Sequence, residues 1–137
     1  MPVERHFFDS NVLVYTIERD ARRQSIAQDL LAQGGVISVQ CLNEFARVAH
    51  RKLGLSWPEV EQARDGFLIL CEPVLPLTLA IHKAGMSLAS ALRLSIYDAL
   101  IVAAALSGNC DVLYSEDMHA GLVIDGRLRI ANPFAPT

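Results

Sequence analysis

Short apolar segments alternate along the chain with longer segments in which apolar residues recur every three or four positions. Residues 6–9, 36–39, 72–75 and 112–114 are short and mostly apolar, which predicts buried strands. Two further short segments, 122–124 and 127–130, flank Asp125 and Gly126, a pattern typical of a hairpin. We therefore expect an α/β fold with a mostly parallel central sheet, helices on both of its faces and the hairpin at its edge.

The longer segments carry helical signals. Apolar residues between positions 42 and 53 follow helical spacing and form one stripe. Ser56 and Glu59 form a capping box, with Pro58 in the first turn of the helix that follows. Further helices are predicted over residues 12–17, 20–33, 77–91 and 95–106. No Pro/Gly/Ser-rich linker separates these elements, so we expect residues 1–137 to form one domain.

Composition supports a folded domain and narrows its setting. The chain has 137 residues, of which 52% are hydrophobic and 20% charged, and this excludes intrinsic disorder. Its longest apolar run, residues 99–106, is far shorter than the ~20 residues that span a bilayer. The first residues lack the apolar stretch of a secretory signal. We expect a cytoplasmic protein that makes no membrane contact.

Cysteine spacing and net charge exclude further classes. Cys41, Cys71 and Cys110 lie far apart and form no Cys-x-x-Cys pair, which disfavours a disulfide framework or a zinc site and favours buried thiols. The net charge of −3 disfavours a globally basic surface for nucleic acid, although a local basic face stays open.

Four acidic residues lie near predicted strand ends. Asp9 follows the first strand, and Asp117 lies in the turn after a later one. Glu44 lies about a turn and a half beyond the second strand, and Asp98 lies in the first turn of a helix. In an open parallel sheet, ligands bind beyond the carboxyl ends of the strands. The four carboxylates are therefore expected in one crevice.

Each acid also has an ordinary structural interpretation. Asp9 is suited to cap the following helix, and Asp98 to a capping box with Ser95. Glu44 has Arg47 at i+3 as a potential ion-pair partner. Asp117 is a common turn residue, and its neighbour, residue 116, is an acid that we expect to be exposed.

Asp98 is the hardest of the four to explain structurally. It is the only charged residue between Arg93 and Asp111, in a helix that is otherwise almost entirely apolar. Such a helix is usually buried on several faces, and a buried carboxylate requires a cation or hydrogen-bond donors. A hard metal ion bound by several carboxylates would satisfy this requirement.

Four segments, taken in order, resemble those of PIN-domain nucleases. They are residues 8–13 with Asp9 and Asn11, residues 43–45 with Glu44, residues 97–105 with Asp98, and residues 113–117 with Asp117. Their order and spacing resemble VapC-type toxins, the single-domain members that pair with antitoxins in type II toxin–antitoxin systems. Met118 and His119 stand where this family usually has an aromatic residue.

This resemblance implies an endoribonuclease that cleaves single-stranded RNA with water activated by one or two Mg²⁺ or Mn²⁺ ions. Asp9, Glu44, Asp98 and Asp117 would be the catalytic, metal-binding carboxylates. Asn11 and Ser115 would donate hydrogen bonds that orient them, although both are also ordinary turn or cap residues.

The resemblance also implies partners. VapC-type toxins typically form homodimers and are inhibited by a cognate antitoxin. The RNA substrate must reach an acidic site, and basic side chains near it would contact phosphates. The candidates form two groups: Arg19, Arg22 and Arg23 in one, and Arg47, Arg51 and Lys52 in the other.

Three alternatives remain open on the sequence. Another Mg²⁺-dependent phosphoryl hydrolase, such as an aspartyl phosphatase, usually has Asp-x-Asp after its first strand, but position 11 is asparagine. A response-regulator-like module would have adjacent acids at the first strand and a lysine on a late strand, which are not visible. A PIN-fold module that only binds proteins is disfavoured by the presence of all four acids.

Overall fold

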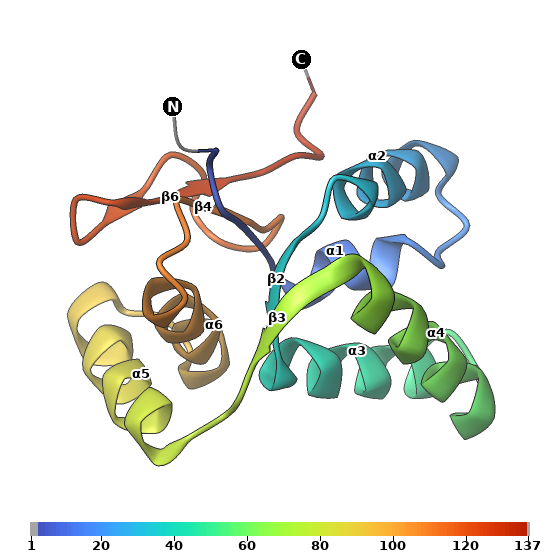
Figure 1. The fold of residues 1–137 in the computed structure, drawn as a ribbon, viewed down its shortest axis with the longest axis horizontal. Coiled ribbons are helices and arrows are strands. Elements are labelled where there is room, and N and C mark those ends of the chain that lie inside the picture. Colours follow the sequence, from blue (N-terminus) through green and yellow to red (C-terminus); the bar gives the residue numbers. More distant parts are fainter. Residues whose placement is uncertain (1–2, 137) are drawn as a thin grey trace.

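A computed structural model describes residues 3–136, which form a six-stranded sheet in the order β3-β2-β1-β4-β6-β5 (Figure 1). All neighbouring strands are parallel except β5, which is antiparallel to β6 at the edge. The strands are β1 (His6–Phe8), β2 (Gly35–Ser38), β3 (Cys71–Leu75), β4 (Val112–Tyr114), β5 (Val123–Ile124) and β6 (Leu128–Ala131). The predicted α/β class, the parallel sheet and the edge hairpin are confirmed.

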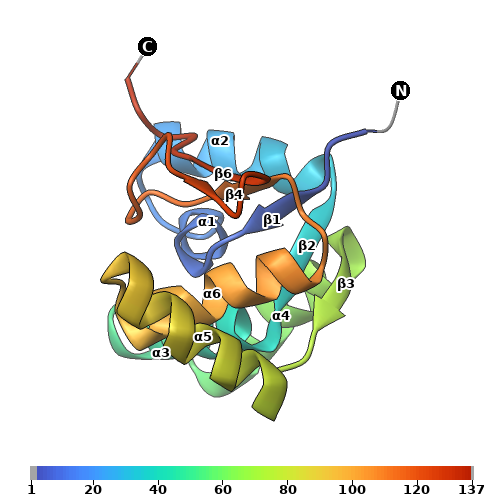
Figure 2. The same cartoon turned by 90° about the vertical axis from the view of Figure 1, so that its left-hand side faces the viewer.

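Helices cover both faces of this sheet. They are α1 (Ser10–Tyr15), α2 (Ala21–Ala32), α3 (Val39–Arg51), α4 (Trp57–Leu70), α5 (Leu79–Leu92) and α6 (Ile96–Ser107). In Figure 1, α5 and α6 lie on one side of the strands, and α1, α2 and α4 lie on the other. Figure 2 shows α5 packed along α6. Helix α3 contacts both α1 and α6, so it joins the two helical layers.

The winding of the chain creates a crevice beside β1. The chain passes from β1 to β2 and β3 on one side, then returns to β4 on the other side of β1. Because such crossovers are right-handed, the reversal places α5 and α6 on the opposite face from the earlier helices. Ligands bind beyond the strand ends at such a switch point. A ligand-binding site is therefore expected at the carboxyl ends of β1 and β4.

The core is built on the central strands and on α6. Phe7, Phe8, Ile37 and Leu113 are fully buried. Every residue of α6 from Ala99 onwards is buried except the last, as its apolar sequence predicts. The three cysteines are buried and free, which confirms the prediction from their spacing.

Helix boundaries differ from the predictions at two junctions. Val39 opens α3 instead of ending β2, because the hydroxyl of Ser38 accepts a hydrogen bond from the Cys41 amide and caps the helix directly after the strand. Leu77 lies outside α5, since Thr78 caps that helix. At the predicted hairpin turn, Asp125 and Gly126 both have positive φ, and the Arg127 amide donates to the Ile124 oxygen across them, as in a type I′ turn.

Among residues 3–136, no single helix has the length and apolar composition to cross a membrane. Helices α5 and α6 pass this test only as a pair, and they meet at a bend of 116°.

Candidate active site

The four acids predicted from the sequence surround the ends of β1 and β4. Asp9 follows β1 and caps α1, and Asp117 lies in the turn after β4. Asp98 lies in the first turn of α6, and Glu44 lies on α3. Burial is the largest cause of the raised pKa values of Asp9 and Glu44. The charges of Asp98 and Asp117 add to both, and the charge of Asp9 adds to that of Glu44. The fold thus brings the four carboxylates within electrostatic reach of one another.

Asp9 is the most buried member of this cluster, with 3% of its surface exposed. Its carboxylate accepts hydrogen bonds from the Ser10 amide (2.6 Å) and from the Ser115 hydroxyl (2.7 Å). Burial raises the pKa of Asp9 to about 6, although both hydrogen bonds act in the opposite direction. The desolvated acid is therefore held in one orientation by two donors.

Asn11 and Ser115 connect the two strand ends. The Ser115 hydroxyl, which is fully buried, also accepts hydrogen bonds from the amides of Asp117 (3.2 Å) and Met118 (3.3 Å). The Asn11 side chain donates to Asp117 Oδ2 (3.2 Å), and its oxygen accepts from the Glu116 amide (3.3 Å). The positions of Asp9 and Asp117 are thus coupled through two polar side chains.

Glu44 carries the one unsatisfied atom of the site. Among residues 3–136, its Oε2 is the only buried side-chain nitrogen or oxygen without a hydrogen-bond partner. Burial, followed by the charge of Asp9, raises the pKa of Glu44 to about 7, while Arg47 lowers it. Burial and the charge of Asp117 likewise raise the pKa of Asp98, which is half-buried. A cation placed among these groups would relieve both the desolvation and the repulsion.

The acidic side chains suit a divalent metal that is bound partly through water. No group of three or more Asp, Glu, His or Cys side chains in the described part of the chain stands close enough to hold an ion by direct contacts alone. Mg²⁺ usually keeps several waters and binds through one or two carboxylates. The carboxylate oxygens, including the unpaired Glu44 Oε2, fit an ion of this kind bound partly through water.

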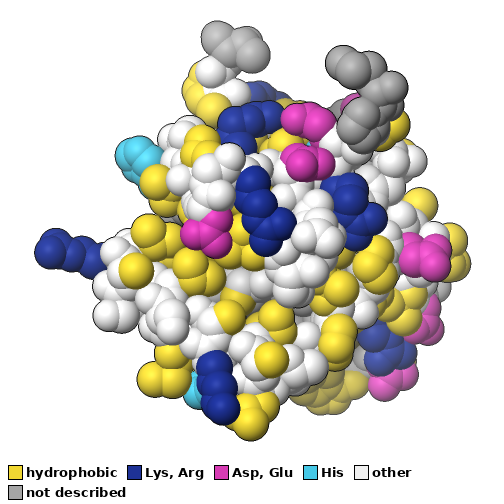
Figure 3. Space-filling model, turned by 60° about the vertical axis from the view of Figure 1, so that its left-hand side comes forward, with side chains coloured by type: hydrophobic (Ala, Val, Ile, Leu, Met, Phe, Trp, Pro, Cys, Tyr) yellow, Lys and Arg dark blue, Asp and Glu magenta, His cyan; other side chains and the backbone are white. Residues whose placement is uncertain are grey.

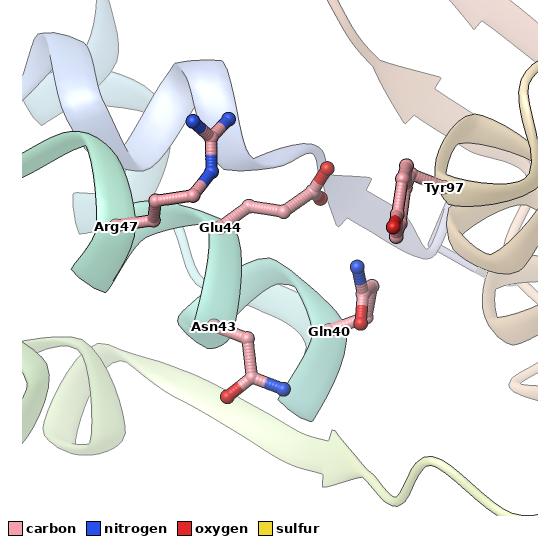
Figure 4. A pocket seen from close by; sticks show the side chains of 5 residues that line it. All are labelled: Gln40, Asn43, Glu44, Arg47 and Tyr97. Atoms are coloured by element: carbon pink, nitrogen blue, oxygen red, sulfur yellow. The ribbon is translucent and has the colours of Figure 1, made fainter.

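A cavity of about 480 Å³ adjoins the carboxylates (Figure 4). Gln40, Asn43, Glu44 and Arg47 of α3 line one side of it, and Tyr97 of α6 lines the other. Of this set, only Glu44 and Arg47 were predicted from the sequence as site residues. The α3 residues lie at i, i+3, i+4 and i+7, a polar stripe that was a usable signal.

The candidate RNA-binding arginines fall in different surroundings. Arg22 donates to the backbone oxygens of Phe134 (2.9 Å) and Ala135 (3.3 Å). Arg23 pairs with Asp20 (2.8 Å) and Glu116 (2.9 Å). Both therefore already have partners within the fold.

The other basic residues are exposed. Arg47 stands beside Glu44 on the cavity wall, and Arg51 follows it one turn later on α3. Arg19 and Lys52 line a separate hollow of about 810 Å³. On the face drawn in Figure 3, Lys and Arg side chains are interspersed with Asp and Glu, so that face carries no continuous basic patch.

Glu116 occupies a different environment from the one expected. Glu116 was predicted to be exposed, but it is partly buried, because it accepts hydrogen bonds from the Tyr15 hydroxyl and from Arg23. Met118 is buried in the core, and His119 is exposed. The turn that holds Asp117 is therefore anchored on both sides of this residue.

Several solved structures have a fold similar to this one. Among solved structures, the chain is similar to a toxin–antitoxin complex from Klebsiella pneumoniae (18% identity, TM-score 0.69, covering 93% of this chain and 97% of that one). It is also similar to VapC20 from Mycobacterium tuberculosis, described as a sarcin-ricin loop cleaving toxin (17%, 0.66, 82% and 89%). A third similar structure is VapBC2 from Rickettsia felis, bound to a DNA fragment from its promoter (21%, 0.65, 93% and 97%).

A comparison with curated proteins finds no significant match. The family model for the PIN domain matches residues 6–120, which include all four acids. The chain belongs to the PIN domain family.

Proposed function

We propose that this protein is an endoribonuclease that cleaves single-stranded RNA with Mg²⁺ or Mn²⁺, and that it is the toxin of a VapBC-type pair. One observation carries the proposal: four carboxylates from four separate elements share one electrostatic environment, and one of their buried oxygens has no partner. Metal ions that neutralise clustered carboxylates are a common means of phosphodiester hydrolysis.

Asp9, Glu44, Asp98 and Asp117 would hold one or two ions. A bound Mg²⁺ or Mn²⁺ supplies an activated water and neutralises charge on the phosphate. The protein's part is orientation: Ser10 and Ser115 fix Asp9, and Asn11 fixes one oxygen of Asp117. Arg47 is the basic residue best placed to contact a phosphate of the RNA, because it lies on the cavity wall beside Glu44 and is exposed.

Similar folds support the proposed partners. The Klebsiella structure is a toxin–antitoxin complex, and the Rickettsia structure contains VapBC2. We infer a cognate antitoxin and a cytoplasmic setting from this likeness. We also infer a homodimer, because the resemblance of the four acidic segments to those of VapC-type toxins implies one.

The test is cleavage of single-stranded RNA by the purified protein in Mg²⁺, in Mn²⁺ and in EDTA. We expect cleavage only with the metals, and none by Asp98→Asn, which removes a charge but keeps the size of the side chain. Asp29→Asn is the matched control, because Asp29 is exposed on α2. Full activity of Asp98→Asn, or cleavage in excess EDTA, would reject the proposal. Hydrolysis of phosphate monoesters without cleavage of RNA would favour another phosphoryl hydrolase.

A further inference from the structure

Three residues that line the cavity beside Glu44 have no role in the proposed chemistry. Gln40 and Asn43 lie on α3, and Tyr97 lies on α6 immediately before Asp98. The cavity of about 480 Å³ falls within the range of pockets that bind small ligands, about 300–1,000 Å³. An aromatic ring on one side and amides on the other form a lining of two distinct kinds.

Gln40 gives the strongest indication of a ligand. Only 8% of its surface is exposed, and that part includes its side-chain amide, which lies open to the cavity and makes no hydrogen bond within residues 3–136. Figure 4 shows this amide directed into the space between Glu44 and Tyr97. Because this amide is accessible from the cavity and unpaired within the fold, its two N–H donors and its acceptor oxygen are free to bind a ligand. The Gln40 amide is therefore placed to bind a polar group that enters the cavity.

Tyr97 supplies the complementary surface. The side chain is 60% exposed, although it belongs to a helix that is otherwise mostly buried. Unpaired nucleobases stack on exposed aromatic rings in proteins that bind single strands. The ring faces the carboxylate of Glu44 across the cavity, so a base stacked on it would lie directly beside the acid cluster.

We propose that this cavity binds one unpaired nucleobase of the RNA, with its face stacked on Tyr97 and its edge hydrogen-bonded to the Gln40 amide. The inference rests on the proposed function, because it assigns the residues that place the substrate against the same site. Arg47, at the other end of the stripe on α3, contacts a neighbouring phosphate. Asn43 is exposed at the rim of the cavity and is available to the base or to its sugar.

The two contacts predict different signatures. Stacking is tolerant of sequence, since every base has an aromatic face, whereas hydrogen bonds to the base edge discriminate among bases. Loss of the Tyr97 ring should therefore weaken the binding of all RNAs to the same extent. Loss of the Gln40 amide should weaken the binding of different RNAs to different extents, and so change the order of preference among the bases.

The experiment measures the affinity of the full-length protein for short single-stranded homopolymers of A, C and U, with Ca²⁺ in place of Mg²⁺ so that the RNA stays intact. Tyr97→Ala should raise Kd about tenfold for every homopolymer. Tyr97→Phe, which keeps the ring, should bind like the wild type. Gln40→Met, which keeps the length of the side chain, should change the ratios of the three Kd values. Gln33→Leu is the control, because Gln33 is exposed and lies outside the cavity.

Thermal melting of each variant establishes that it is folded, and Tyr97 is exposed enough to be replaced without loss of packing. If wild-type protein cleaves RNA while Tyr97→Ala and Gln40→Met keep its affinities and base preference, the nucleobase pocket is overturned and the proposed function stands. If the wild type binds none of the homopolymers and cleaves no RNA, both proposals are overturned.

Discussion

The hydroxyl of Ser115 donates a hydrogen bond of 2.7 Å to Oδ2 of Asp9, although the two residues are 106 positions apart. Both are buried, and they follow the neighbouring parallel strands β4 and β1. The same hydroxyl accepts from the amides of Asp117 and Met118. One side chain thus orients one acid and fixes the turn that carries another.

Replacement of Ser115 by alanine should therefore affect both stability and the site. The change leaves the two amides and one carboxylate oxygen without this partner in a buried place, which costs about 1–3 kcal/mol. We expect a lower free energy of unfolding by chemical denaturation, and weaker binding of Mn²⁺ by calorimetry. Ser107→Ala is the comparison, since the Ser107 hydroxyl donates only to the backbone oxygen of Ala104 on its own helix. Equal effects of the two substitutions would contradict the role given to Ser115.

Glu44 should make the metal-free protein less stable as the pH rises. Its pKa is raised from 4.5 to about 7, first by burial and then by the charge of Asp9. A carboxyl group with a raised pKa in the folded state favours folding fully below its unfolded pKa, and this contribution is lost as the pH rises through its folded pKa. Glu44→Gln cannot titrate. As the pH rises from 4.5 to 7, the free energy of unfolding of the variant should therefore increase by about 1 kcal/mol relative to that of the wild type, after discounting for partial exposure.

The measurement is chemical denaturation of both proteins in EDTA across this pH interval. Glu61→Gln is the control, because Glu61 is an exposed glutamate on α4. A constant difference between wild type and Glu44→Gln at every pH would show that Glu44 is not desolvated in the folded protein.

Divalent metal should stabilise the folded protein through the acid cluster. A ligand that binds only the folded state at about 100 times its Kd adds roughly 2.7 kcal/mol. We expect saturating Mn²⁺ to raise Tm of the wild type, and to have little effect on Asp98→Asn. Asp29→Asn should respond like the wild type, since Asp29 lies on α2 away from the cluster. An equal shift in all three proteins would assign the stabilisation to binding elsewhere.

The sequence could predict the acid cluster because each acid adjoins an element whose type was clear. Once strands and helices are assigned, parallel winding places Asp9 and Asp117 at the carboxyl ends of their strands. The structure adds that these two strands are neighbours. Asp98 was marked by its isolation in an apolar helix, and that helix is indeed buried from Ala99 onwards. These predictions used only local pattern and a general rule of topology.

The cavity and the partners of the arginines could not be predicted in this way. Gln40 and Tyr97, which are more than 50 positions apart in the sequence, face each other only because α3 and α6 pack together. Likewise, Arg22 bonds to Phe134 and Arg23 to Glu116, each across most of the chain. The sequence alone does not show which basic residues acquire a hydrogen-bond or ion-pair partner in the fold.

This difference predicts opposite consequences for two arginines. Arg23 is engaged by Asp20 and Glu116, so Arg23→Leu should lower the stability of the protein more than its affinity for RNA. Arg47 is exposed on the cavity wall, and it forms no ion pair with any of the described residues. Arg47→Leu should leave Tm nearly unchanged and weaken RNA binding. It should also reduce the slope of log Kd against log salt by about 1, as expected for one lost phosphate contact.

Melting curves and a salt series of RNA binding on the two variants separate these effects. Because the ion pairs of Arg23 are exposed to solvent, which screens them, the loss of stability in Arg23→Leu should be modest. A lower salt slope for Arg23→Leu would show that RNA displaces Glu116 from this guanidinium. An unchanged slope for Arg47→Leu would remove Arg47 from the path of the phosphates.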